Sequence, residues 1–177
     1  MCIRDRTGTG RIRTILTDED PLLRTVSAPV ELDADSATPT DPSLDQDIAD
    51  LAETLRDFRE RAGFGRAISA PQIGIMKRLI VMNLGDGPIA IINPEITKRS
   101  SDTQMVWDDC LSVPGRLVEV ERNLNISLTY RDWAGQLIEW EDLAPDMSEL
   151  LQHECDHLDG VLMTDRAASP DSVRAIP

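Results

Sequence analysis

Apolar residues recur every three or four positions from residue 44 to residue 62, which is the spacing of one buried helical face. This apolar stripe consists of Leu44, Ile48, Leu51, Leu55, Phe58 and Ala62. The pattern predicts an N-terminal amphipathic helix packed against a core. Ser43 and Gln46 have the spacing of a capping box at its start, and Gly63 and Gly65 supply its end.

Five short segments rich in aliphatic residues follow, each bounded by turn residues such as Asp86-Gly87-Pro88. They predict strands at residues 78–83, 89–93, 117–122, 124–130 and 136–140. Short turns join antiparallel strands most simply. A second helix is expected from Asp146, with Glu149 completing a capping box and Gly160 at its end. Strands grouped between helices predict an α+β fold of mostly antiparallel short strands around this central second helix.

The length of 177 residues suits one domain with its own core. We expect residues 11–177 to form a single catalytic domain. Residues 1–10 are expected to be a non-native or disordered N-terminus, because residues 1–6 resemble the translation of a transposon end. Residues 33–43, rich in Asp, Pro, Ser and Thr, predict a surface loop.

Charge and cysteine content narrow the class of protein. The net charge is −14, from 18 basic and 32 acidic side chains, so nucleic acid and anionic membranes are poor partners. No apolar run approaches a membrane span, and no targeting segment is visible. Three widely spaced cysteines form no disulfide framework, which indicates the reducing cytoplasm.

The candidate chemistry begins in the second predicted helix, where His153 and His157 are four residues apart. Helical geometry places them on one face, so that both imidazoles can reach one metal ion. Glu154 lies to the side of this pair, where it can act on a metal-bound water as general base and acid. Chance would give this arrangement of the only two histidines on the order of once in a thousand sequences.

The spacing of residues in the sequence does not by itself identify the third metal ligand. A long zinc-protease pattern would place a histidine where this chain has Met163. The remaining candidates are a downstream carboxylate, such as Asp165 or Asp171, or the thiolate of Cys110. Cys155 points about 200° away from His153 around the helix, and we interpret it as a small buried hydrophobic residue.

Three motifs together resemble the peptide deformylase family. The loop at residues 65–72 has the sequence Gly-Arg-Ala-Ile-Ser-Ala-Pro-Gln, the segment at 108–112 has Asp-Asp-Cys-Leu-Ser, and residues 153–157 have His-Glu-Cys-Asp-His. The family has Gly-x-Gly-x-Ala-Ala-x-Gln, Glu-Gly-Cys-Leu-Ser and His-Glu-x-x-His in this order. The resemblance covers residues 15–166. It implies a metal-dependent hydrolase of protein biosynthesis that releases formate from N-formyl-methionyl peptides.

The resemblance also implies the roles of particular residues. Cys110, His153 and His157 would bind one divalent metal ion, by family preference Fe(II), with Zn(II) or another divalent metal as a substitute. Glu154 would accept a proton from the attacking water and return it to the departing amine.

Further roles follow from the same motifs. The Gln72 amide and the Leu111 backbone N–H would stabilise the oxyanion. Asp108, paired with Arg122, would orient the metal ligands without binding the metal itself. The substrate would contact residues around the side-chain pocket, namely Gly65, Arg66, Ala67, Val106 and Leu150.

Several positions depart from the family pattern. Asp108-Asp109 replaces Glu-Gly, Ser69 replaces an alanine, and Arg66 stands where an apolar residue is usual. Arg174 is the one basic residue after Arg166, which makes ribosome docking doubtful. Two alternatives therefore stay open: a zinc peptidase with a carboxylate as third ligand, and a deformylase-like paralogue that binds metal without catalysis.

Overall fold

The computed structural model describes residues 9–169 and 171–176, and it combines two α-helices with two antiparallel sheets. Helix α1 spans Leu44–Ala62 and helix α2 spans Pro145–Leu158. The expected α+β fold with mostly antiparallel strands is confirmed. The proposed artefact at residues 1–6 lies outside the described residues.

The larger sheet has five strands in the order β1-β2-β3-β6-β7, and the smaller has three in the order β4-β5-β8. Every pair of neighbouring strands is antiparallel. In chain order the strands are β1 (Ala67–Ser69), β2 (Leu79–Met82), β3 (Ile89–Arg99), β4 (Thr103–Asp109), β5 (Arg116–Asn123), β6 (Ile126–Arg131), β7 (Leu137–Leu143) and β8 (Val173–Ala175).

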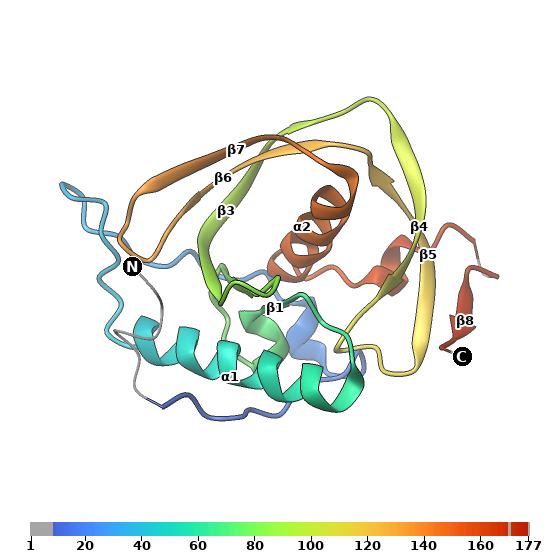
Figure 1. Ribbon diagram of the computed structural model, residues 1–177, viewed down its shortest axis with the longest axis horizontal. Coiled ribbons are helices and arrows are strands. Elements are labelled where there is room, and N and C mark those ends of the chain that lie inside the picture. Colours follow the sequence, from blue (N-terminus) through green and yellow to red (C-terminus); the bar gives the residue numbers. More distant parts are fainter. Residues whose placement is uncertain (1–8, 170, 177) are drawn as a thin grey trace.

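Helix α2 lies beneath the arch made by β3, β6 and β7, with β4 and β5 beside it and α1 on the other side of β1 (Figure 1). Leu151 and Leu158 of α2 are fully buried in a cluster with residues of β2, β3 and β6. A second cluster joins the apolar face of α1 to β1 and β2 through Leu51 and Leu55. Burial of this apolar area holds α2 and the strands around it in fixed positions.

Both predicted capping boxes are wrong. The Ser43 hydroxyl contacts the side chains of Asp41 and Asp47, and no side chain caps the first turn of α1. Helix α2 begins at Pro145, one residue before the predicted start, and it also has no side-chain cap. Acidic neighbours compete for the Ser43 hydroxyl, and proline at the first position already removes one unpaired donor.

The predicted strands lie inside observed strands or overlap them, but three strands were not predicted, namely β1, β4 and β8. The strand predicted at 89–93 continues to Arg99, which lengthens the arch over α2. Strand β7 is an edge of the larger sheet, and its Glu139 and Glu141 side chains are exposed. No helix in the described part of the chain is long and apolar enough to cross a membrane.

Candidate metal centre

Three buried side chains with donor atoms meet between β4 and α2. Cys110 directly follows β4, whereas His153 and His157 lie one turn apart on α2. Their potential ligand atoms all lie within 4.8 Å of one another, and each residue is at most 6% exposed. The structure thus brings together the three residues that the family resemblance implied.

The donor set and its spacing fit a single divalent metal ion. Cys110 Sγ lies 3.2 Å from His157 Nε2. Two ligands of a tetrahedral zinc or similar ion, at bond lengths of about 2.3 and 2.0 Å, are about 3.5 Å apart. One thiolate and two imidazoles also leave a fourth position for water or substrate, which is the arrangement of a catalytic centre.

The Asp108 carboxylate contacts Nδ1 of the His153 ring. One Asp108 carboxylate oxygen lies 3.0 Å from His153 Nδ1 and accepts a 2.7 Å hydrogen bond from Arg122. A carboxylate at Nδ1 leaves Nε2 as the nitrogen that can face a metal. The predicted contact between Asp108 and Arg122 is therefore present, although Asp is one methylene shorter than the family's Glu.

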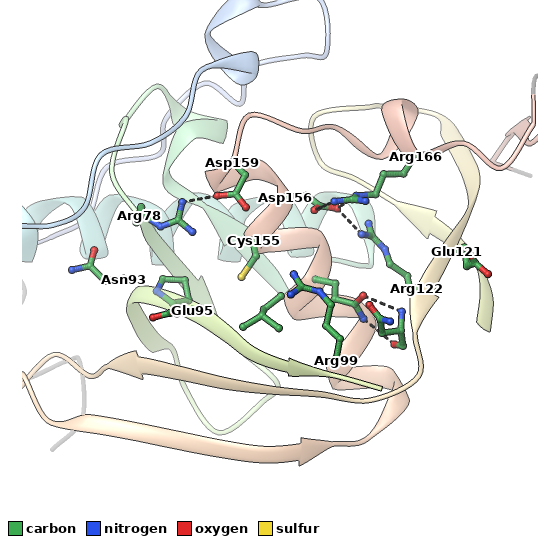
Figure 2. Close-up of a pocket in the computed structure, with 14 residues that line it drawn as sticks. Arg78, Asn93, Glu95, Arg99, Glu121, Arg122, Cys155, Asp156, Asp159 and Arg166 are labelled. Carbon is green, nitrogen blue, oxygen red and sulfur yellow. Dashed lines mark hydrogen bonds and ion pairs between the residues drawn. The ribbon is translucent and has the colours of Figure 1, made fainter. Parts of the chain in front are cut away.

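Arg122 continues this network to Asp156 of α2. It also donates to Asp156 at 2.5 Å, and Arg166 donates to the same carboxylate at 2.5 and 2.6 Å (Figure 2). These groups line a cavity of about 470 Å³ that does not include the three candidate ligands. The sequence did not indicate Asp156 or Arg166, because neither lies in a motif position with a known role.

The charges in this network shift its ionisation equilibria. Burial would raise the pKa of Asp108, but His153 and Arg122 hold it well below its usual range. Burial lowers the pKa of His153, yet the carboxylate of Asp108 and the sulfur of Cys110 raise it well above the usual value. Burial and the neighbouring His153 hold the pKa of His157 well below its usual value.

The candidate base, Glu154, is 3% exposed and lines the cleft beside the ligands. Burial raises the pKa of its carboxyl, whereas His153 and a hydrogen bond from Ser69 oppose that rise. The Ser69 hydroxyl contacts both Oε2 and the backbone oxygen of Glu154. The sequence showed Ser69 only as a departure from the alanine of the family motif. That departure was the signal that could have indicated a functional contact at this position.

Gln72 lies beside Cys110, in the 3-10 helix Ala70–Ile73. Its Oε1 accepts a hydrogen bond from the backbone N–H of Ser69, which turns Nε2 toward Ser112 at 3.1 Å and toward the Cys110 sulfur at 3.6 Å. Leu111 lines the cleft directly after Cys110. Both predicted oxyanion donors thus lie next to the metal ligands.

A cleft of about 330 Å³ leads to His153 and Glu154. Four of the five predicted substrate-contacting residues line it, namely Gly65, Arg66, Ala67 and Leu150. Val106 is not part of that lining and packs against the buried cluster around Cys110. Val106 belongs to β4, which the sequence did not predict, and it shares the inner face of that strand with Asp108.

Arg66 is not free in the cleft. Its guanidinium donates to Glu149 at 2.5 Å and to the backbone oxygen of Asp146 at 3.2 Å. Glu149 was predicted as a capping residue, but it forms this ion pair instead, between the loop before β1 and helix α2.

Asp165 and Cys155, also considered as metal ligands, are not part of the group formed by Cys110, His153 and His157. Asp165 forms an ion pair with Arg24 at 2.7 Å and accepts a hydrogen bond from the backbone N–H of Leu162. Cys155 is 5% exposed, packs in the cluster of α2 with β2, β3 and β6, and lines the cavity on the far face of α2. Burial raises the pKa of its thiol to about 12. The interpretation of Cys155 as a buried hydrophobic residue is confirmed.

The fold and the site together define a metal-dependent hydrolase with the His-Glu-x-x-His motif on a helix and a cysteine as third donor. Comparisons with known proteins give the family. The family model for polypeptide deformylase matches residues 12–173. A peptide deformylase of Thermotoga neapolitana is 38% identical over 147 residues, which cover 83% of this chain and 82% of that protein.

Solved structures agree with this match. The peptide deformylase of Thermotoga maritima has a TM-score of 0.77 at 36% identity and covers 90% of this chain and 99% of its own. A Met-Ala-Ser-bound peptide deformylase of Acinetobacter baumannii has a TM-score of 0.75 at 27% identity, covering 89% and 99%. The chain belongs to the polypeptide deformylase family, and it is a hydrolase.

Proposed function

We propose that this protein removes the formyl group from N-formyl-methionyl peptides by metal-dependent hydrolysis and releases formate. The single observation that carries the proposal is the convergence of three buried donor residues, one of which, His153, lines the same cleft as the buried Glu154. A purely structural metal site has no need of a carboxylate beside its ligands. This favours an active enzyme over a non-catalytic paralogue.

Cys110, His153 and His157 would hold the metal, which we propose to be Fe(II), with Zn(II) or another divalent ion able to replace it. When bound, such an ion acts as a Lewis acid that polarises the formyl carbonyl and makes water more acidic. The thiolate favours soft or borderline ions over magnesium and calcium. Asp108 would fix the orientation of His153 through its hydrogen bond to Nδ1.

The remaining steps belong to side chains of the cleft. Glu154 takes a proton from the attacking water, and the oxygen of that water forms a bond to the formyl carbon. The Gln72 amide and the Leu111 N–H donate hydrogen bonds to the oxyanion that develops. Glu154 then gives the proton to the departing nitrogen as the C–N bond breaks, so that formate and a free amino terminus result.

The substrate would lie along the cleft between β4 and the loop before β1. Gly65, Ala67 and Leu150 line that cleft, and Arg66 closes part of it with Glu149. The A. baumannii structure carries Met-Ala-Ser, which is the deformylated form of a formyl-Met peptide. We infer the same class of peptide for this chain.

The wider setting is part of the same proposal. We infer a single catalytic domain at residues 11–177, with α2 as its central metal-binding helix and α1 as its amphipathic N-terminal helix. The reducing cytoplasm would keep Cys110 as a free thiol, and both described cysteines are free. The proposal includes no ribosome contact. Arg174, the one basic residue after Arg166, has its guanidinium 3.8 Å from the centre of the Trp107 ring.

Formate release tests the proposal directly. Protein purified without oxygen and loaded with Fe(II) should release formate from formyl-Met-Ala-Ser at one equivalent per free amino terminus. Glu154→Gln should keep its metal but lose about 10²-fold or more in kcat. Metal-loaded wild-type protein that releases no formate would exclude the proposed activity and leave the non-catalytic paralogue.

A further inference from the structure

A serine hydroxyl touches the carboxylate that the proposed mechanism uses as its base. Ser69 is fully buried at the end of β1, and its Oγ donates to Glu154 Oε2. This contact joins two elements that are 85 residues apart in the sequence. The peptide deformylase motif has alanine here, so the hydroxyl is a feature of this chain rather than a general part of the family pattern.

The position of Ser69 is fixed from two sides. It pairs with Ile80 in the antiparallel ladder of β1 and β2, and it also begins the 3-10 helix Ala70–Ile73. There its backbone N–H donates to Gln72 Oε1 at 2.9 Å, which ties Ser69 to this helix. The hydroxyl therefore approaches Glu154 from a rigid backbone.

The same residue links the base to the oxyanion donor. Ser69 holds the amide of Gln72 through its backbone and the carboxylate of Glu154 through its side chain. Glu154 is 3% exposed, so bulk water cannot easily replace this donor. A hydrogen bond from a neutral hydroxyl favours the ionised form of a buried carboxylate and restricts its rotamers.

The hydroxyl also has a second acceptor on the same residue. Its Oγ lies 3.1 Å from the backbone oxygen of Glu154. When the carboxylate takes up a proton it becomes a weaker acceptor, and the serine hydrogen bond can move to this backbone oxygen. The contact can thus support the base before proton transfer and release it afterwards.

We propose that Ser69 is a positioning residue for the Glu154 base, holding its carboxylate in the cleft while its backbone N–H holds the Gln72 amide. This inference rests on the proposed function and deepens it. Ser69 does not touch the reacting atoms itself. Its effect should therefore appear in kcat and in the pH profile, and not in substrate binding.

The test compares Ser69→Ala with Ser148→Ala in metal-loaded protein. Ser148 is equally buried, belongs to α2 and donates to the backbone oxygen of Asn123 at 2.9 Å. Ser69→Ala should lower kcat on the order of tenfold, leave KM within about twofold, and move the acid limb of kcat up by about one pH unit. Ser148→Ala should leave all three values near those of wild type.

A second pair of variants separates the hydroxyl from side-chain size. Threonine and valine have the same shape and differ in one hydroxyl group, so Ser69→Thr should approach wild-type kcat and Ser69→Val should behave like Ser69→Ala. This pair also decides the matter if Ser69→Ala fails to fold. Equal kcat and equal acid limbs for Thr and Val, or for Ala and wild type, would overturn the proposed role.

One readout does not depend on activity. Crystal structures of the zinc-loaded variants should show the Glu154 carboxylate in its wild-type rotamer in Ser69→Thr and in a different rotamer in Ser69→Val. If wild-type protein releases no formate, the proposed function fails, and this comparison still tests the serine contact. An identical Glu154 rotamer in the two variants would contradict the inference in either case.

Discussion

Cys110 and Cys155 show at the level of single residues how position decides chemistry. Both are buried and both are free thiols. Cys110 contacts His157 and Gln72, which are polar groups, whereas Cys155 packs among aliphatic side chains. Helical geometry was sufficient to predict that Cys155 faces away from the histidines. Cys110 required the family motif, because a contact between a loop and a helix leaves no periodic signal in the sequence.

Exchange of each cysteine for alanine tests this difference. Cys110→Ala should lower the bound metal from about one equivalent to a small fraction and reduce formate release by about 10²-fold or more, since one of three ligands is lost. Cys155→Ala should keep metal and activity and cost roughly 1 kcal/mol in stability through its small cavity. Metal analysis and formate release give the result. Full metal and activity in Cys110→Ala would point to a carboxylate ligand.

At the level of helices and strands, the periodicity of apolar residues was a better predictor than the capping motifs at helix ends. The stripe from Leu44 to Ala62 gave the bounds of α1, because a buried helical face needs apolar residues at fixed intervals. The capping box of α1 failed because acidic neighbours bind the Ser43 hydroxyl, and that of α2 failed because Pro145 begins the helix and Glu149 pairs with Arg66. Strand β4 was missed because Met105 and Trp107 are on its exposed face and Asp108 is on the inner one, which reverses the usual alternation.

The apolar face of α1 should carry much of the stability of its half of the core. Leu51 is fully buried against β1 and β2, so Leu51→Ala should lower the free energy of unfolding by about 2–5 kcal/mol. Leu84 is 52% exposed and provides the control, with an expected change within about 0.5 kcal/mol for Leu84→Ala. Urea denaturation measures both. Similar losses for the two variants would show that α1 contributes little.

A buried carboxylate on α1 should make the fold sensitive to acid. Asp50 accepts hydrogen bonds from the backbone N–H of Arg11 and from the side chains of Arg13 and Gln46. Burial would raise the pKa of Asp50, but these donors together lower it below its usual value. The stabilisation is therefore complete above the unfolded pKa of about 3.9 and is lost as the pH falls through the lower folded value.

Asp50→Asn should show this pH dependence. The variant should unfold about 1–3 kcal/mol more easily at pH 7, and its difference from wild type should shrink as the pH drops below about 4. Asp57→Asn on the same helix, which loses only an exposed pair with Arg61, should change stability by about 0.5 kcal/mol or less. Denaturation at both pH values is the measurement. A constant loss for Asp50→Asn across pH would contradict the expectation.

At the scale of the whole molecule, the candidate centre joins two parts of the chain. Cys110 follows the smaller sheet, whereas both histidines belong to α2. A ligand that binds only the folded state stabilises it by about 2.7 kcal/mol when its free concentration is 100 times Kd. Chelation should therefore lower the Tm of wild-type protein and of Cys155→Ala, but not that of Cys110→Ala. Thermal unfolding with and without chelator tests this, and an unchanged wild-type Tm would argue against the centre.

The acidic edge of the larger sheet has a consequence for crowded solutions. Within residues 9–169 and 171–176 no strand pairs with the outer edge of β7, and an uncovered strand is a template on which further chains can assemble. Glu139 and Glu141 are exposed along it, and two copies approaching edge to edge would bring four carboxylates together. Repulsion at this edge should oppose fibril-like stacking, so lysine at both positions should keep that protection, whereas valine should remove it and promote aggregation.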